Sequence, residues 1–245
     1  MEDKYYLMFE TKEKLPGYPD FFDSGISNIK QSLEEDRIAS CVEDTVELTT
    51  YTPKISFDFQ VVSSNYFVSD ILWEVICDYI SWELIFKKIL MFNKNKKNVA
   101  TKGYIVFSFL NQYDKKRNYI DSLESLYVVP NFKQKRQAEL LQPSINYEIL
   151  RKFDVLPSLY DGYTNSLVVS EKFMKDSRLE NTKLEFLPLE KAGKILLHRE
   201  DRIKRLYKIK TDSELESLTP IKGKVLLNEG FKEKNILTNT DIKGN

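Results

Sequence analysis

The sequence is poor in the residues on which most metal and hydrolytic sites depend. Its 245 residues include a single histidine, His198, and two cysteines that form no CxxC pair. A histidine-based metal cluster is therefore excluded. No G-x-S-x-G motif surrounds any serine that would use His198 as its base. His198 ends an apolar run, and we expect it to lie half-exposed at the end of a strand.

Glycine is also scarce, and the motifs of phosphate-binding loops are missing. The chain has eight glycines and neither G-x-x-x-x-G-K-[ST] nor G-x-G-x-x-G, so we expect no nucleotide-dependent chemistry and no cofactor. Cys41 and Cys77 are expected to be free, buried thiols in a reducing compartment. The opening MEDKYYLMFETKEK lacks the basic region and the apolar run of a secretory signal, which predicts a cytoplasmic protein.

Charge is balanced overall but unevenly distributed. Lys plus Arg and Asp plus Glu number 37 each, yet residues 1–82 hold sixteen acidic and six basic side chains. That segment carries −10 and the remainder +10, which fits either two oppositely charged lobes or charges that neutralise each other across a shared core. The basic clusters at 94–97, 115–117 and 133–136 are interpreted as solvated surface, because no nucleic-acid motif accompanies them. An RNA-binding module is a weaker alternative.

Strand-like patterns outnumber helical ones and do not alternate with them, which predicts an α+β fold with mixed or largely antiparallel sheets. The alternation at 54–61 places Ile55, Phe57, Phe59 and Val61 on one face of a strand. The other expected strands are 4–9, 103–110, 126–129, 166–170, 184–187, 195–198 and 206–209. Helices are expected at 26–36 and 132–141, besides the long one described next.

A long central helix is predicted at about 69–92, with Ser69 as its N-cap and the polar segment 93–98 as a turn after it. Charged side chains inside its apolar stretch exclude a membrane span. The organisation is either a single domain, 1–245, or two closely packed lobes at about 1–100 and 101–231, with a frayed tail at 232–245.

Three carboxylates, Asp70, Glu74 and Asp78, recur at i, i+4 and i+8 on this helix. Like charges at this spacing weaken an isolated helix by a few tenths of a kcal/mol per pair. Either basic residues from the second half of the chain compensate for them, or the stripe binds a positively charged partner.

The chain contains a faint internal echo. Residues 61–63 (VVS), followed by Phe67, resemble residues 168–170 (VVS), followed by Phe173. The echo indicates either a duplication or a chance match of small residues.

The segment from Tyr160-Asp161 to Leu189 carries the most specific pattern. It contains VVSE at Val168, Val169, Ser170 and Glu171, followed by Phe173, and a strand ending in F-L-P-L that includes Phe186 and Pro188. This pattern, with the opening KYYLMF, resembles the C-terminal motif of bacterial immunity proteins of polymorphic toxin systems, namely immunity family eleven and the related family forty-three. We expect Val168, Val169 and Phe173 to lie in the core and Ser170 to cap a short helix with Glu171 in its first turn.

The resemblance implies a non-catalytic cytoplasmic protein that binds and neutralises a cognate toxin, encoded by a neighbouring gene, through occlusion. The expected contact is the stripe of Asp70, Glu74 and Asp78. The alternative is a carboxylate-based hydrolase of unknown substrate, which needs two carboxylates close together. Neither reading implies a membrane partner, and nucleic acid is not favoured.

Overall fold

A computed structural model describes residues 4–10, 45–50, 53–62, 65–110, 118–129, 138–158, 166–193 and 219–231. Several predictions concern other residues and lie outside this described part. They are the helix at 26–36, most of the helix at 132–141, the strands at 195–198 and 206–209, Cys41, His198, Tyr160 and Asp161, the basic clusters at 115–117 and 133–136, and the tail at 232–245.

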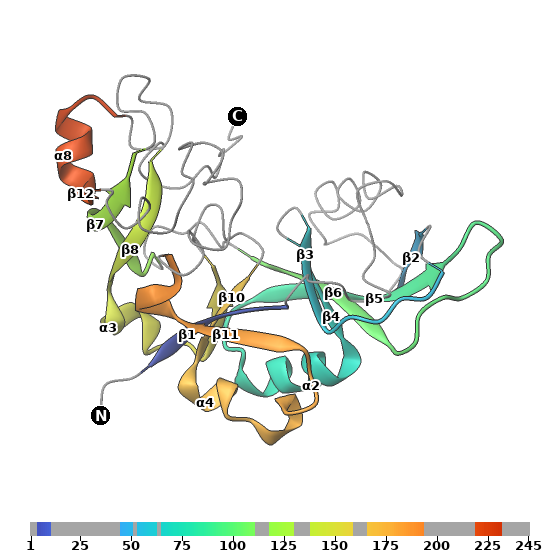
Figure 1. Cartoon of the computed structure of the whole chain (residues 1–245). Helices are drawn as coiled ribbons and strands as arrows, with labels where there is room; N and C mark the ends of the chain where they lie inside the picture. The colour runs from blue at the N-terminus through green and yellow to red at the C-terminus, as the bar shows by residue number, and fades with distance from the viewer. Residues whose placement is uncertain are drawn as a thin grey trace.

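The described chain is built from three sheets with short helices on them, and the α+β prediction is confirmed at this level (Figure 1). No helix in these ranges is long and apolar enough to cross a membrane. The largest sheet has the order β2-β5-β6-β4-β3, with β2 parallel to β5 and the other pairs antiparallel. Its elements are β2 (Thr45–Thr49), β3 (Phe59–Val62), β4 (Asn65–Ser69), α2 (Asp70–Tyr79), β5 (Leu84–Phe92) and β6 (Tyr104–Phe109).

The second sheet brings the first strand of the chain together with its C-terminal half. Its order is β11-β1-β10-β9, and all pairs are antiparallel. Its elements are β1 (Tyr5–Glu10), α3 (Tyr147–Leu150), β9 (Val155–Pro157), β10 (Leu167–Ser170), α4 (Glu171–Met174), the 3-10 turn η3 (Ser177–Leu179) and β11 (Leu184–Pro188).

The third sheet is antiparallel, in the order β12-β7-β8. It consists of β7 (Ile120–Val128), β8 (Glu139–Ile145) and β12 (Ile221–Lys222), and α8 (Gly223–Asn228) packs on β7. Tyr127 and Leu140 from this sheet and Leu226 from α8 join one large buried cluster with Leu7, Val168 and residues of α2. A second cluster, around Phe57, Phe67 and Met91, fills the opposite face of the five-stranded sheet.

The prediction of a long helix at 69–92 is wrong in its second half. The helix ends at Tyr79, and residues 84–92 form β5, which lies between β2 and β6. The segment LIFKKILMF allows this, because Ile89 and Met91 are buried on one side while Phe86, Lys88 and Leu90 face the other. The turn at 93–98 therefore follows a strand, with Lys96 at a positive φ of 55°.

Three further expectations are corrected. Ile55, Phe57, Phe59 and Val61 are all buried, but the strand begins at Phe59, and the first pair lies in one core while the second lies in the other. The chain bends at Asp58, so the four side chains do not share a face. Residues 139–141, expected at the end of a helix, belong to β8. Cys77 is exposed on α2 rather than buried.

The two larger sheets contain the same unit of four strands and one helix. In the first unit the strand order is β5-β6-β4-β3, and α2 follows β4 directly. In the second the order is β11-β1-β10-β9, and α4 follows β10 directly. Strand β1 thus occupies in the second unit the place that β6 occupies in the first, although it comes from the opposite end of the chain.

Matching hydrogen bonds fix the correspondence. The Ser69 N–H donates to the Asp58 carbonyl at 3.0 Å, and the Ser170 N–H donates to the Asp154 carbonyl at 2.9 Å. Each serine hydroxyl donates to the side chain of the same aspartate, at 2.9 Å and 2.5 Å respectively. The same hydrogen-bonded arrangement therefore occurs twice, with Ser69 as the counterpart of Ser170. The sequence echo, which aligned residues 61–63 with 168–170, does not follow this correspondence.

The β-strand registers agree with this correspondence. Ser69 lies opposite Tyr104, and Ser170 lies opposite Tyr5. Both tyrosine hydroxyls bond to the backbone a few residues before the aspartate of their unit. Tyr5 donates to the Leu150 carbonyl at 2.8 Å, and Tyr104 accepts from the Phe57 N–H at 3.2 Å. Each aspartate–serine pair therefore begins one strand, ends its neighbour and caps the following helix.

Replacing either capping serine should destabilise the protein. The hydroxyls of Ser69 and Ser170 accept from the N–H groups of Leu72 and Phe173 at 3.4 Å and 3.2 Å while donating to the aspartates. We expect Ser69→Ala and Ser170→Ala each to lower the free energy of unfolding by about 1–2 kcal/mol. Ser69→Ala should cost more, because the Asp58 side chain is 9% exposed and that of Asp154 is 34% exposed. Urea denaturation measures both.

Ser177→Ala is the matched control, because Ser177 is exposed and the capping side chain of its turn is that of Asp176. Its change should lie within about 0.5 kcal/mol. Equal stability of all three variants would refute the role of the aspartate–serine pairs.

Candidate functional site

The predicted acidic stripe lies on the solvent side of α2. Asp70, Glu74 and Asp78 are exposed, whereas Leu72, Val75 and Ile76 face the core. Ser69 caps the helix and Asp70 occupies its first turn, as the sequence indicates. A carboxylate there is stabilised by the partial positive charge of the helix N-terminus.

Asp78 is paired with the second half of the chain. Its Oδ2 accepts from Nη1 of Arg178 at 2.7 Å, and the same guanidinium bonds both carboxylate oxygens of Asp176. Tyr79 donates its hydroxyl to Asp176 at 3.1 Å. The guanidinium holds the pKa of Asp176 well below its usual range. Compensation by a basic residue is therefore the correct reading for Asp78, and sequence reasoning did not identify Arg178.

The negative charge of the stripe is thus concentrated toward Asp70 and Glu74. Asp70 Oδ1 accepts from the Ile71 N–H at 2.9 Å. Among the described residues, Glu74 has no hydrogen bond or ion pair at its carboxylate, so its charge faces solvent. Of the three carboxylates predicted to contact a partner, Asp70 and Glu74 remain candidates.

An exposed apolar face of β5 contacts the helix that carries these carboxylates. Phe86 and Leu90 of β5 are 55% and 40% exposed. Helix α2 packs mainly on β4 and β6, so among the described residues it covers little of this face of β5. Trp73 connects helix and strand: its ring centroid lies 4.8 Å from that of Phe86 and 5.4 Å from that of Phe107. Lys88, also exposed, lies between Phe86 and Leu90 on the same face.

Helical geometry decides which residues of α2 share this surface. Successive residues turn by about 100°, so Trp73 and Cys77 lie on the flank toward β5, whereas Ile71 and Asp78 lie on the flank toward η3. The contacts of Trp73 with Phe86 and of Asp78 with Arg178 agree with this. We define the α2–β5 surface as Asp70, Trp73, Glu74, Cys77, Phe86, Lys88 and Leu90.

The motif residues within the described part form the core of the second unit. Val168, Val169 and Phe173 have no exposed surface, and Ser170 caps α4 with Glu171 in its first turn, as predicted. Phe186 and Pro188 lie half-buried in β11, paired with Met8 and Tyr6 of β1. These residues build the sheet and do not converge with the acidic stripe.

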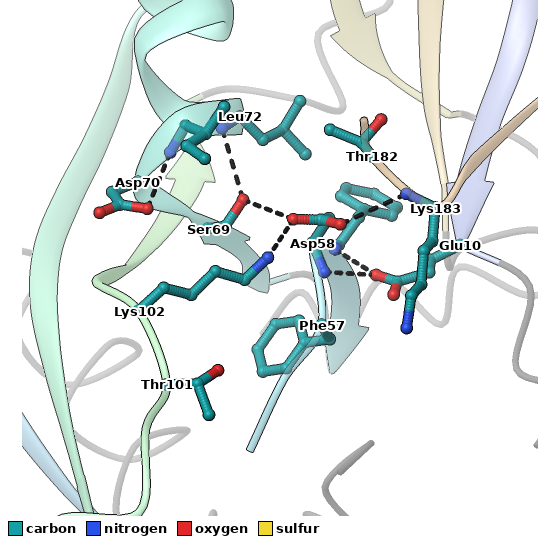
Figure 2. A network of polar contacts seen from close by, with 12 residues as sticks. Glu10, Phe57, Asp58, Ser69, Asp70, Leu72, Thr101, Lys102, Thr182 and Lys183 are labelled. Atoms are coloured by element: carbon teal, nitrogen blue, oxygen red, sulfur yellow. Dashed lines mark hydrogen bonds and ion pairs between the residues drawn. The ribbon is translucent and has the colours of Figure 1, made fainter. Parts of the chain in front are cut away.

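A second group of polar residues connects the two units. The Glu10 Oε2 accepts from the N–H groups of Asp58 and Phe59 at 2.7 Å and 2.5 Å (Figure 2). The Asp58 carboxylate accepts from the Ser69 hydroxyl, from the Lys102 ammonium and, at 3.3 Å, from the Lys183 N–H. The network joins β1, β3, β4, the segment before β6 and the start of β11.

Glu10 and Asp58 are two carboxylates in one network, so they are the pair to weigh as a hydrolase site. Glu10 and Asp58 are 4% and 6% exposed. Burial raises the pKa of Glu10, two backbone N–H groups oppose the rise, and the Asp58 charge adds to it. Three of the four carboxylate oxygens are occupied by these structural hydrogen bonds, which favours a role in holding the sheets together.

Removing the Glu10 charge should change how stability depends on pH. A carboxyl whose folded-state pKa exceeds the unfolded value of about 4.5 binds more protons when folded, so the unfolding free energy falls as pH rises between these two values. Glu10→Gln should lack this fall, so its stability relative to wild type should improve from pH 4 to pH 7. Urea denaturation over that range measures the difference.

Glu148→Gln serves as the control, since Glu148 is exposed on α3. Its stability should follow that of wild type at every pH. Parallel stability curves for wild type and Glu10→Gln would contradict the raised pKa.

Comparison with models of known protein families finds no match, and comparison with curated proteins finds none either.

Proposed function

We propose that this chain is an immunity protein that binds and neutralises a cognate bacterial toxin by occlusion, without catalysis of its own. The observation that carries the proposal is the α2–β5 surface: Phe86 and Leu90 are exposed on one face of β5, and Phe86 contacts Trp73 of the helix that carries the exposed Asp70 and Glu74. Aromatic anchors surrounded by polar groups are typical of the centres of protein interfaces. That the partner is a toxin follows from the resemblance of the VVSE and F-L-P-L segments.

The chemistry of the surface indicates what the partner must offer. Its apolar centre needs a matching apolar patch, and the carboxylates of Asp70 and Glu74 need Lys or Arg around that patch. Lys88 needs a carboxylate or open solvent. A basic toxin face with an apolar centre meets these requirements, and covering such a face blocks access to it.

The anchors stand on regular elements and not on loops. Trp73 is held between Phe86 and Phe107, and Phe107 is fully buried. A surface that is already ordered loses little conformational entropy on binding. Rigid backbone beneath an exposed aromatic ring therefore supports a protein-binding role.

The alternative, a carboxylate-based hydrolase, rests on the Glu10–Asp58 pair and the raised pKa of Glu10. Both carboxylates are nearly buried and already bonded to backbone N–H groups or to Lys102, so a substrate would have little access to them. This favours the binding function. Asp58→Asn would abolish activity in a hydrolase of this kind, whereas an immunity protein would lose only stability.

Rescue of growth is the first test. Cells that express the toxin domain encoded beside this chain should grow when the chain is co-expressed, and the pair should co-purify in a one-to-one complex. A toxin that kills equally with and without this chain, with no complex formed, would refute the proposal.

Substitutions on the α2–β5 surface should weaken the complex. We expect Phe86→Ala to lower affinity at least tenfold, by loss of a central anchor. Glu74→Lys should mainly slow association, with a weaker salt dependence, and Lys88→Glu should have the opposite effect on association with a basic partner. Surface plasmon resonance at two salt concentrations measures both rates.

Leu123→Ala and Glu148→Lys are the matched controls, since Leu123 is 42% exposed on β7 and Glu148 is exposed on α3. Both should bind as wild type does. If rescue persists and all five variants bind equally, the toxin contact lies elsewhere on the protein.

A further inference from the structure

A cavity of about 590 Å³ opens where β1 begins, away from the α2–β5 surface. Three segments distant in sequence form it: the start of β1, α3 with the residue after it, and the end of β11 with the helical residues 189–193. Its volume lies within the range of about 300–1,000 Å³ that is typical of small-molecule sites.

Hydrogen bonds and close packing hold these segments in place. The Tyr5 hydroxyl donates to the carbonyls of Leu150 and Phe153 at 2.8 Å and 3.3 Å, which fastens α3 to β1. Tyr6 lies opposite Pro188 in the sheet. Gly193 packs so closely on β8 that a Cβ there would lie 2.3 Å from the Leu141 carbonyl oxygen. The walls of the cavity are therefore fixed by the fold.

Among the described lining residues, three are cationic, Lys4, Arg151 and Lys191, and one is acidic, Glu190. The Glu190 carboxylate accepts a hydrogen bond from the Tyr147 hydroxyl. The described part of the lining therefore carries more positive than negative charge. Lys and Arg are the side chains that bind phosphate groups, Arg with two parallel hydrogen bonds.

Flat side chains complete the lining. The rings of Tyr6, Tyr147 and Pro188 present apolar surface beside the three cations. Aromatic rings stack with nucleobases. The cavity therefore combines groups for a phosphate with groups for a planar ring.

We propose that this cavity binds a nucleoside phosphate of nucleoside diphosphate size. Lys4, Arg151 and Lys191 hold the phosphates, and Tyr6 and Tyr147 contact the base. The site does not use the glycine-rich loop that the sequence lacks, because side chains replace backbone N–H groups as donors. The cations are exposed, so binding weakens as salt rises.

Isothermal titration of the full chain with ADP at low salt tests the proposal. Wild type should bind with a Kd on the order of 0.1 mM, a binding free energy of roughly −5 kcal/mol. Arg151→Glu and Tyr147→Ala should each weaken binding at least tenfold. Lys152→Glu, next to Arg151 but outside the lining, should bind as wild type does.

Circular dichroism and a thermal melt of each variant separate lost binding from lost folding. If Arg151→Glu does not fold, Lys191→Glu replaces it. No saturation by ADP up to millimolar concentration, or equal weakening by Arg151→Glu and Lys152→Glu, would overturn the proposal. Pyrophosphate binding as tightly as ADP would overturn the part assigned to the tyrosines. None of these results depends on the toxin.

Discussion

The carboxylate of Asp58 is the point on which the arrangement of the sheets depends. It receives the hydroxyl of Ser69, the ammonium of Lys102 and the N–H of Lys183, while Glu10 bonds the backbone N–H of Asp58 itself. Its side chain is 9% exposed, so loss of one donor would leave charge poorly solvated, at a cost of several kcal/mol. One aspartate thereby fixes the cap of α2, the start of β3 and the contact with the second unit.

The second unit contains the same kind of aspartate–serine pair, but its aspartate is less buried. Asp154 receives the Ser170 hydroxyl and lies 3.7 Å from the Lys172 ammonium, but its side chain is 34% exposed. The second unit is also closed by β1, which pairs with β10 across more than 150 positions of sequence. Pairing over such a separation costs loop-closure entropy before it contributes stability. The buried Glu10 at the end of β1 then ties that strand to the first unit.

Much of the fold follows from local sequence signals, and the errors have identifiable causes. The caps at Ser69 and Ser170 were predictable, because a serine followed by an acidic residue and then an apolar residue satisfies the first turn of a helix. The change from helix to strand after Tyr79 was not predictable, because a short apolar run such as LIFKKILMF suits either element when it is buried. Pairing with β2 and β6 makes this segment a strand, and such long-range contacts cannot be seen in a single sequence. Arg178, 100 residues from Asp78, was missed for the same reason.

This one error alters the candidate site. On a helix continued to residue 92, Phe86 and Leu90 would be placed by a period of 3.6, whereas on β5 they share a face with Lys88 beside Trp73. Leaving that face bare is costly, because burying a side chain of this size contributes about 1.5–3 kcal/mol. Nearly every other aromatic ring of the five-stranded sheet is buried. Among the described residues, an exposed aromatic ring on an otherwise well-packed sheet is not accounted for by stability, and it fits the protein-binding surface proposed above.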